Sequence, residues 1–351
     1  MILLFASAFF VTIVAVVGLR PVAESIGLVD KPNGRKNHLG EVPLVGGVAV
    51  YMAILFVVNL LVPDSQLISL YLISCSFMVL IGALDDYYDL NAKVRLVAQF
   101  FIASILVFGA NFSLSNLGDL FGFGIVDLGI FGIPFTLLAV PTAINAFNMT
   151  DGIDGLVGFL GIVTFTSLSI LTFWTGDTEL FAIAISFVAA LGAFLLFNLG
   201  GLRRAFGRVF MGDAGSMMIG LSVIWLLVLG TQHDAGFRPI TAVWIIAIPL
   251  LDMFSVMHRR VKKGNSPLMA DRDHLHHIML RLGLSHKQSL FIIVSLSCLF
   301  SAIGLIGEYF VISENIMVGL FIIIFIVYDH VFMHIWKYTK WYKNLRNYPL
   351  Q

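Results

Sequence analysis

Long runs of apolar residues recur along the whole chain and constrain its fold more than any other feature. Eleven such runs lie near residues 1–19, 44–62, 67–84, 96–110, 128–147, 156–174, 180–199, 216–231, 240–257, 289–309 and 315–334. About 20 apolar residues in a helix cross a bilayer core about 30 Å thick. Only 12% of the residues are charged, against about 25% in soluble domains. The sequence therefore predicts an all-α polytopic membrane protein with about eleven transmembrane helices, and it excludes a water-soluble globule, a disordered chain or a disulfide scaffold.

The basic residues predict how these helices are oriented. No Lys or Arg precedes Arg20, and basic residues follow the first run, which favours a retained span over a cleaved signal peptide. With the N-terminus outside, 20 of the 21 basic residues fall in cytoplasmic loops or the C-terminal tail, and only Arg238 falls outside. We therefore expect the N-terminus outside and the C-terminus in the cytoplasm.

The sequence shows no internal repeat, low-complexity stretch or linker, so we expect one integral-membrane domain over residues 1–351. Its predicted active-site loops are cytoplasmic and lie near residues 20–43, 85–95, 148–155, 200–215 and 258–288. The formal net charge is zero, which argues against a nucleic-acid partner. The two cysteines lie inside apolar runs, and we interpret them as packing residues.

Three aspartates form a D-x-x-D-type pattern after the third run, in Asp85, Asp86 and Asp89. If this segment is helical, Asp85 and Asp89 are neighbours on one face. Carboxylates this close repel one another unless a cation joins them, and hard oxygen ligands suit Mg²⁺ or Mn²⁺ shared with substrate phosphates. A solvated acidic helix end would explain the pattern equally well.

Two further acidic motifs are more specific. Asp151 and Asp154 follow Asn148 and are interleaved with glycines, which let the backbone approach a ligand closely. Asp213 begins the eighth run, where backbone N–H groups at a helix N-terminus suit phosphate and the carboxylate suits a metal. The alternative for Asp213 is an ordinary helix N-cap.

Three histidines, His274, His276 and His277, follow Arg272 in the long loop 258–288. Imidazole and guanidinium groups can contact phosphate, sugar or base. A soft metal is disfavoured because no cysteine is near.

The carboxylates, asparagines and histidines converge on one predicted membrane surface. Such a set fits a Mg²⁺-dependent reaction between a membrane lipid phosphate and a soluble diphosphate, which needs positioning and charge neutralisation. Asp252, inside the ninth run, stays open between a functional role and a side chain that reaches the membrane interface.

These motifs together resemble the polyprenyl-phosphate N-acetylhexosamine-1-phosphate transferase family. The matching segments are Asp85-Asp86-x-x-Asp89, Asn145-x-x-Asn148-x-x-Asp151-Gly-x-Asp154-Gly, Phe210-Met-Gly-Asp213-x-Gly-Ser216, His274-x-His276-His277, Asp30-Lys31-Pro32-Asn33-x-Arg35-Lys36-x-His38 and Pro43-x-x-Gly46-Gly47. The resemblance covers nearly the whole chain, in order. The loop 271–277 favours the bacterial members that start O-antigen and enterobacterial common antigen synthesis over the peptidoglycan translocase, which uses a muramyl-pentapeptide nucleotide.

The resemblance implies a reaction at the cytoplasmic face of the bacterial inner membrane. UDP-N-acetylglucosamine and undecaprenyl phosphate would give undecaprenyl-diphospho-N-acetylglucosamine and UMP, with Mg²⁺, or alternatively Mn²⁺, as cofactor. The lipid phosphate would attack the β-phosphorus, so the sugar keeps its configuration. Another UDP-N-acetylhexosamine stays open as the donor. The sequence also leaves open whether the lipid phosphate attacks directly or after a covalent phospho-aspartate intermediate. The oligomeric state also stays open, and a homodimer would be unsurprising.

The resemblance also implies roles for individual residues. Asp213 and Asp86 are expected to bind the metal, and Asp85 to orient or deprotonate the lipid phosphate. The residues expected to hold the nucleotide, diphosphate or sugar are Asp151, Asp154, Asn148, Asn198, Arg272, His274, His276 and His277. Lys36 and Lys93 are expected as phosphate contacts.

Two other classes of protein share parts of this pattern. An intramembrane aspartyl protease carries a G-x-G-D motif, but residue 210 is Phe where that motif has glycine, and three acidic motifs would be unexplained. A secondary transporter binds its substrate near the bilayer midplane, often between repeated halves. The charges here lie at one predicted surface without a repeat, so we favour the transferase.

Overall fold

The computed structural model describes residues 1–31, 40–63, 65–233, 236–266 and 274–345, with side chains to residue 339. The helices are α1 (Ile2–Ile26), α2 (Gly46–Leu61), α3 (Gln66–Tyr88), α4 (Ala92–Ser104), η1 (Ile105–Gly109), η2 (Gly129–Phe131), α5 (Gly132–Thr150), α6 (Leu156–Thr175), α7 (Thr178–Asn198), α8 (Leu202–Phe206), α9 (Gly212–Gln232), α10 (Pro239–Ile245), α11 (Ala247–Lys262), α12 (Leu275–Arg281), α13 (His286–Tyr309) and α14 (Glu314–Leu345). Strands β1 (Val29–Asp30) and β2 (Val42–Pro43) pair antiparallel, with Val29 opposite Pro43. The predicted all-α class is confirmed.

Each of the eleven predicted apolar runs coincides with a helix or with two adjoining helical segments. Within the described ranges, nine helical segments are long and apolar enough to cross a bilayer, or ten if α10 and α11 form one bent span. Helix α2, with 16 residues, is shorter than this requirement. The chain is therefore a multi-pass membrane protein, and the count of eleven spans stays a prediction.

The ninth run is not one straight helix, because α10 and α11 meet at Ile246 with a bend of 78°. Pro249, in the first turn of α11, has no N–H to donate to the carbonyl of Ile245, so the helical hydrogen bond across the bend cannot form there. The bend gives α11 a direction of its own, and Asp252 is buried on this second segment.

Helix α9 forms the centre of the bundle, and every residue of its most apolar 18-residue stretch is buried. At its N-terminal end, α2 and α3 approach the α9 backbone through glycines. A Cβ at Gly47 would strike the backbone of Gly215, and a Cβ at Gly82 would strike the backbone of Ala214. These contacts fix the start of α9 against the end of α3 and so position the acidic motifs of both helices.

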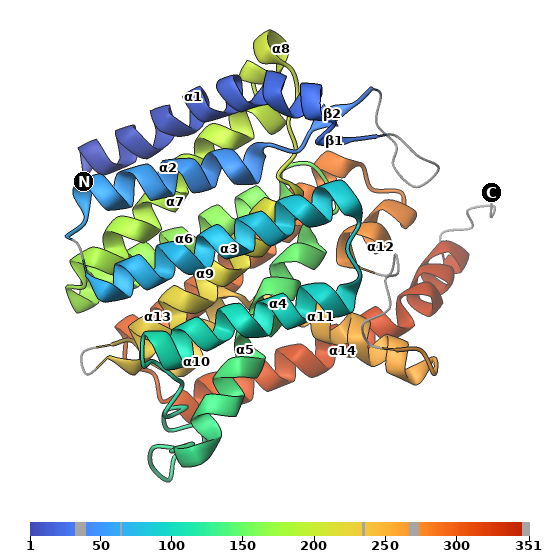
Figure 1. Cartoon of the computed structure of the whole chain (residues 1–351). Coiled ribbons are helices and arrows are strands. Elements are labelled where there is room, and N and C mark those ends of the chain that lie inside the picture. The colour runs from blue at the N-terminus through green and yellow to red at the C-terminus, as the bar shows by residue number, and fades with distance from the viewer. Residues whose placement is uncertain (32–39, 64, 234–235, 267–273, 346–351) are drawn as a thin grey trace.

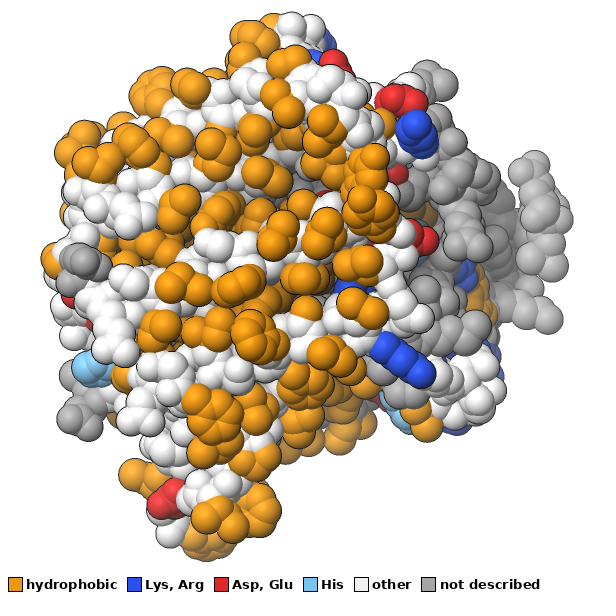
Figure 2. Space-filling model, in the orientation of Figure 1, with side chains coloured by type: hydrophobic (Ala, Val, Ile, Leu, Met, Phe, Trp, Pro, Cys, Tyr) orange, Lys and Arg blue, Asp and Glu red, His pale blue; other side chains and the backbone are white. Residues whose placement is uncertain are grey.

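The face of the bundle seen in Figure 2 carries apolar side chains along the length of its helices. Large apolar side chains such as Phe5, Phe101 and Phe291 are exposed in the structure, as expected of a protein whose surface faces lipid. The chain begins at the end of the bundle opposite β1, β2, α8 and α12 (Figure 1). Arg238, predicted apart from the other basic residues, also lies at the end away from β1 and β2, where its Nε is 3.0 Å from Glu308 Oε2.

Candidate active site

The end of α3 and the start of α9 meet through the carboxylate of Asp86. The N–H of Asp213 donates to Asp86 Oδ1 (2.8 Å), and the N–H of Ala214 donates to Asp86 Oδ2 (3.2 Å). Gly212 has φ of 72°, and a Cβ there would lie 2.5 Å from Asp86 Oδ2. Asp86 thus satisfies N–H groups that the sequence had suggested for phosphate, and Asp213 lies in the first turn of α9 rather than at its N-cap.

Asp213 is held by an asparagine from another helix. Asn148, on α5, donates its Nδ2 hydrogens to Asp213 Oδ1 (2.6 Å) and to Ser216 Oγ (3.0 Å). Both asparagine bonds reach the first turn of α9. The residue therefore joins the second acidic motif to the third, although the two are separated by about 65 positions in the sequence.

Arg95, near the start of α4, joins the first acidic motif to Asp213. Its Nη1 donates to Asp85 Oδ2 at 2.6 Å and lies 3.9 Å from Asp213 Oδ2. Asp85 is 4% exposed, and its Oδ1 accepts from the N–H of Leu90. Asp89 lies apart from this cluster, because it ends α3 as an exposed residue with φ of 54°. The expected i,i+4 neighbour relation between Asp85 and Asp89 therefore does not place Asp89 in the site.

Asp151 follows α5 directly. Its pKa is raised to about 8, because protein atoms surround the carboxyl and because Asp213 and Asp86 carry charge of the same sign. The charges of the cluster therefore raise the pKa of Asp151, although no hydrogen bond joins Asp151 to the cluster among the described residues. A cation among these carboxylates would favour their ionised forms.

The cluster fits a divalent cation of the hard type. Asp213 and Asp86 present carboxylate oxygens at one place, and Mg²⁺ is commonly bound by one or two carboxylates together with substrate phosphates and water. Within the described part of the chain, no three His, Cys, Asp or Glu side chains form a preformed metal cage. A bound cation would therefore take its remaining ligands from substrate and solvent.

Asp154 lies in an ion pair with Arg208, from the segment that precedes α9. The guanidinium of Arg208 also stacks over the Phe210 ring, 4.6 Å from its centroid, and burial lowers the pKa of Arg208. Asn198, at the end of α7, is buried and donates Nδ2 to the carbonyl of Val209 (2.9 Å). Both residues therefore hold the segment leading to Asp213 in place.

The histidine loop is seated on the same end of the bundle. Asp252 of α11 accepts from the N–H of Leu275 (2.7 Å) and lies 2.9 Å from His274 Nδ1. His276 is 2% exposed and packs over Gly152, where a Cβ would strike the imidazole. His277 lies against His276, with ring centroids 4.2 Å apart. His276 therefore joins the histidine loop to the turn between Asp151 and Asp154.

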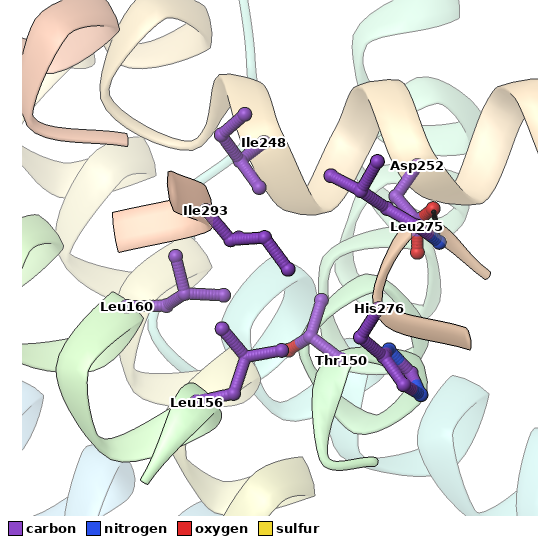
Figure 3. Close-up of a pocket in the computed structure, with 8 residues that line it drawn as sticks. All are labelled: Thr150, Leu156, Leu160, Ile248, Asp252, Leu275, His276 and Ile293. Carbon is purple, nitrogen blue, oxygen red and sulfur yellow. Dashed lines mark hydrogen bonds between the residues drawn. The ribbon is translucent and has the colours of Figure 1, made fainter. Parts of the chain in front are cut away.

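The packing beneath α12 leaves little free space (Figure 3). Thr150, Asp252, Leu275 and His276 line a cavity of about 10 Å³ together with apolar residues of α6, α11 and α13. That volume suffices for about one water. Substrate must therefore approach α12 from another side.

Burial and, to a smaller extent, the positive charges of the neighbouring histidines lower the pKa of His276 to about 2. Its Nε2 is buried without a hydrogen-bond partner among the described residues. His276 is therefore neutral at ordinary pH and cannot offer phosphate a positive charge in this arrangement.

Comparison with known proteins identifies relatives of the chain. Residues 68–231 match the model of glycosyl transferase family 4. Undecaprenyl-phosphate alpha-N-acetylglucosaminyl 1-phosphate transferases of Escherichia coli O157:H7 and Salmonella typhi are 41% and 42% identical to the chain, each over 97% of the chain and 93% of the relative. The Yersinia pestis protein of the same name is 41% identical over 93% of the chain and 90% of the relative.

The chain belongs to the polyprenyl-phosphate N-acetylhexosamine-1-phosphate transferase family. The resemblance inferred from the motifs is thereby confirmed. Phosphotransferases of this family generally depend on a divalent metal. The matched segment 68–231 contains the entire carboxylate cluster and ends before the histidine loop.

The transferase motifs identified from the sequence are only partly brought together. Asp85, Asp86, Asp213 and Asn148 form one network, which Asp151 adjoins. Lys93 is exposed on α4, and its side chain has no hydrogen bond or ion pair with the described residues. Lys36 and Arg272 lie outside the described residues.

Two arginines of the site were missed by the sequence analysis as functional residues. Arg95 and Arg208 were counted only for orientation, yet each pairs with a motif aspartate. Arg95 follows Asp85 by ten positions and comes after a turn, and Arg208 follows Asp154 by 54. The loop 85–95 holds three aspartates and two basic residues, Lys93 and Arg95, so the sequence could have marked Arg95 as a candidate partner. No comparable signal marks Arg208, which lies among three arginines and one aspartate in the loop 200–215.

Proposed function

We propose that the chain transfers N-acetylglucosamine 1-phosphate from UDP-N-acetylglucosamine to undecaprenyl phosphate. The products are undecaprenyl-diphospho-N-acetylglucosamine and UMP. One observation carries the proposal: a carboxylate cluster with Asn148 and Arg95 lies at one end of an apolar bundle, in a chain about 41% identical to transferases named for this reaction. The apolar surface suits the lipid substrate, and the polar end suits the nucleotide.

Arg95 and Asp85 are proposed to receive the lipid phosphate. Arg95 lies between Val94 and Val97, which are exposed on the outer face of α4. A phosphate arriving from the bilayer would meet this guanidinium, which can bind two phosphate oxygens at once. Asp85 orients Arg95 through their 2.6 Å contact. A phosphate monoester is largely ionised at neutral pH, so orientation matters more than a strong base.

Asp213 and Asp86 are proposed to hold Mg²⁺, with Mn²⁺ as the alternative. The cation supplies charge neutralisation for the diphosphate and the leaving UMP. Asn148 fixes the Asp213 carboxylate through its 2.6 Å bond, and the two α9 N–H groups fix Asp86. Whether the lipid phosphate attacks directly or after an aspartyl-phosphate step is an outcome that trapping experiments distinguish.

The donor is proposed to bind beside the turn 151–155 and the histidine loop that packs on it. Asp151 borders the cluster, and His277 is half-buried at the same end of the chain. Asn198 and the Asp154–Arg208 pair support this site from behind by holding the segment before α9. Arg272 and Lys36 are proposed as phosphate contacts, as the family motifs imply. Lys93 is proposed as an outer phosphate contact, since its side chain is exposed.

The protein is proposed to reside in the bacterial inner membrane with the site facing the cytoplasm. The distribution of 20 of the 21 basic residues supports this orientation. Facing that side, the site meets cytoplasmic UDP-sugars, and the product would begin O-antigen or enterobacterial common antigen type polysaccharides. The whole chain is proposed to act as one domain, alone or as a homodimer.

The test uses purified protein in detergent with undecaprenyl phosphate, Mg²⁺ and labelled UDP-sugars. Labelled lipid and UMP should form from UDP-N-acetylglucosamine, and both should be lost with EDTA or in Asp213→Asn. Asp177→Asn is the matched control, because Asp177 caps α7 away from the cluster and asparagine caps a helix as well as aspartate does.

Each outcome has a definite meaning. Labelling from a different UDP-N-acetylhexosamine alone would keep the reaction and replace the donor. Labelling that persists in EDTA would contradict the metal assignment. The absence of any labelled lipid in folded protein would refute the transferase proposal.

A further inference from the structure

A buried carboxylate, Asp252, links the start of the donor-side histidine loop to the bundle. It lies on α11 after the bend and is 3% exposed. Both of its oxygens are used: Oδ1 accepts from the N–H of Leu275, and Oδ2 lies 2.9 Å from His274 Nδ1. Figure 3 shows Asp252 reaching from α11 to Leu275 at the start of α12, with His276 next in the chain.

The two contacts of Asp252 fix the position of His274 and determine which of its ring nitrogens carries the proton. An ionised carboxylate can only accept hydrogen bonds, so the contact requires a proton on Nδ1. The other ring nitrogen, Nε2, then lies on the side of the ring away from Asp252 and makes no hydrogen bond with the described residues. A carboxylate that holds one nitrogen in this way sets the tautomer and orientation of a histidine.

Asp252 also influences the positions of His276 and His277, because both lie on α12, which it holds at Leu275. His276 follows Leu275 directly and packs over Gly152, and His277 packs on His276. The cavity of about 10 Å³ beneath these residues leaves no room for α12 to settle deeper. A change at Asp252 is therefore transmitted to the turn that follows Asp151.

We propose that Asp252 is a positioning residue for the nucleotide donor: by holding Leu275 and His274 it directs His274 Nε2 at the donor and sets the place of His276 and His277 on α12. The inference rests on the proposed function, because it takes these histidines as donor contacts. It assigns Asp252 no contact with substrate and no part in binding the lipid phosphate.

The structure provides a matched control for this inference. Asp329 of α14 lies 2.8 Å from His258 Nδ1 of α11, so it forms the same kind of pair. This contact is made with α11 rather than with α12. Asp329→Asn therefore removes a carboxylate–histidine pair without touching the histidine loop.

The test compares Asp252→Asn with Asp329→Asn in the labelled-lipid assay. An asparagine cannot satisfy both contacts, because its amide presents NH₂ where one carboxylate oxygen accepted. We expect Asp252→Asn to raise the donor KM about tenfold and to leave the lipid KM unchanged. Asp329→Asn should change neither value. The KM does not depend on how much of the protein is folded, so partial misfolding would lower only the apparent kcat.

A second variant keeps the inference testable if Asp252→Asn does not fold. His274→Asn can place an amide nitrogen near the Nδ1 position and so keep the Asp252 contact, while it removes Nε2. We expect this variant to melt close to the wild type in detergent and to raise the donor KM as well. In the double variant, the rise in donor KM should be smaller than the product of the two single effects, because the residues act through one contact.

The possible results separate this inference from the proposed function. Wild-type protein that makes no labelled lipid would refute the proposed function, and this inference with it. An active wild type would refute this inference alone if Asp252→Asn, or His274→Asn where the first variant does not fold, keeps the wild-type donor KM. Equal effects of Asp252→Asn and Asp329→Asn, or single effects that multiply in the double variant, would refute it too.

Discussion

Asp85 and Asp86 are adjacent in the sequence, yet they have different partners. Asp85 is buried and paired with Arg95, whereas Asp86 accepts two backbone N–H groups of α9. Adjacent positions near the end of a helix point about 100° apart, so the two carboxylates face different neighbours. This difference supports separate roles, with Asp85 beside the lipid phosphate and Asp86 beside the metal.

The Arg95 pair leads to a prediction about stability. Arg95→Ala should lower the free energy of unfolding by about 1–3 kcal/mol, because it leaves the buried Asp85 carboxylate without its ion pair. Asp85→Asn in the same chain should restore part of the loss, since a neutral amide needs no counter-charge. Thermal melting in detergent measures both. Equal melting of Arg95→Ala and the double variant would contradict this account of the pair.

His276 predicts a pH dependence of stability. Its folded pKa is about 2, against 6.5 in the unfolded chain, so the unfolded state binds an extra proton below about pH 6.5. Stability should therefore fall as the pH drops from 6.5, by at most about 1.4 kcal/mol per pH unit from this residue.

The matched variant for His276 is His276→Gln, which cannot titrate in this range. Its melting temperature should decline less than that of the wild type between pH 7 and pH 5. Parallel declines of the two proteins would show that His276 is not the group responsible.

The positions of the elements explain which site residues the sequence could reveal. Asp85, Asp86, Asn148 and Asp213 lie in short motifs that carry their own chemical signal, and the network confirms that they meet. Their pairing with Arg95 and Arg208 depends on which helices become neighbours, and no local pattern states that. The neighbour relation of Asp85 and Asp89 was conditional on a helix through Asp89, and α3 ends at Tyr88.

The close contact between helices α3 and α9 leads to a prediction about how their packing supports the site. Gly82→Ala should push α3 away from the Ala214 backbone and so pull Asp86 from the N–H groups it accepts. We expect a loss of about 1–3 kcal/mol in stability and a turnover at least tenfold lower. Gly192→Ala on α7 is the control, because nothing lies within 4 Å of the added Cβ. Equal behaviour of the two variants would contradict the close contact as the source of the geometry.

At the scale of the whole molecule, the apolar runs predicted the bundle well, because lipid allows few alternatives to helices. The run pattern could not foresee the 78° bend at Ile246 or the short α2, since hydropathy carries no information about direction. The same bend orients the α11 segment that carries Asp252, so the feature least visible in the sequence is the one that positions the histidine loop.

The two ends of the bundle predict the orientation in the membrane. Phe123 is 97% exposed in the segment between η1 and η2, and this segment is tied to the far end of α9 by the bond from the Ser115 N–H to Gln232. Lys93 is exposed at the end that carries the site. In a chain whose two cysteines are replaced by alanine, we expect Phe123→Cys to react with an impermeant maleimide in intact spheroplasts. Lys93→Cys should react only after the membrane is opened, because the positive-inside distribution places its end in the cytoplasm. The reverse pattern would place the active site outside, where no cytoplasmic nucleotide sugar could reach it, and would contradict the proposed function together with the orientation.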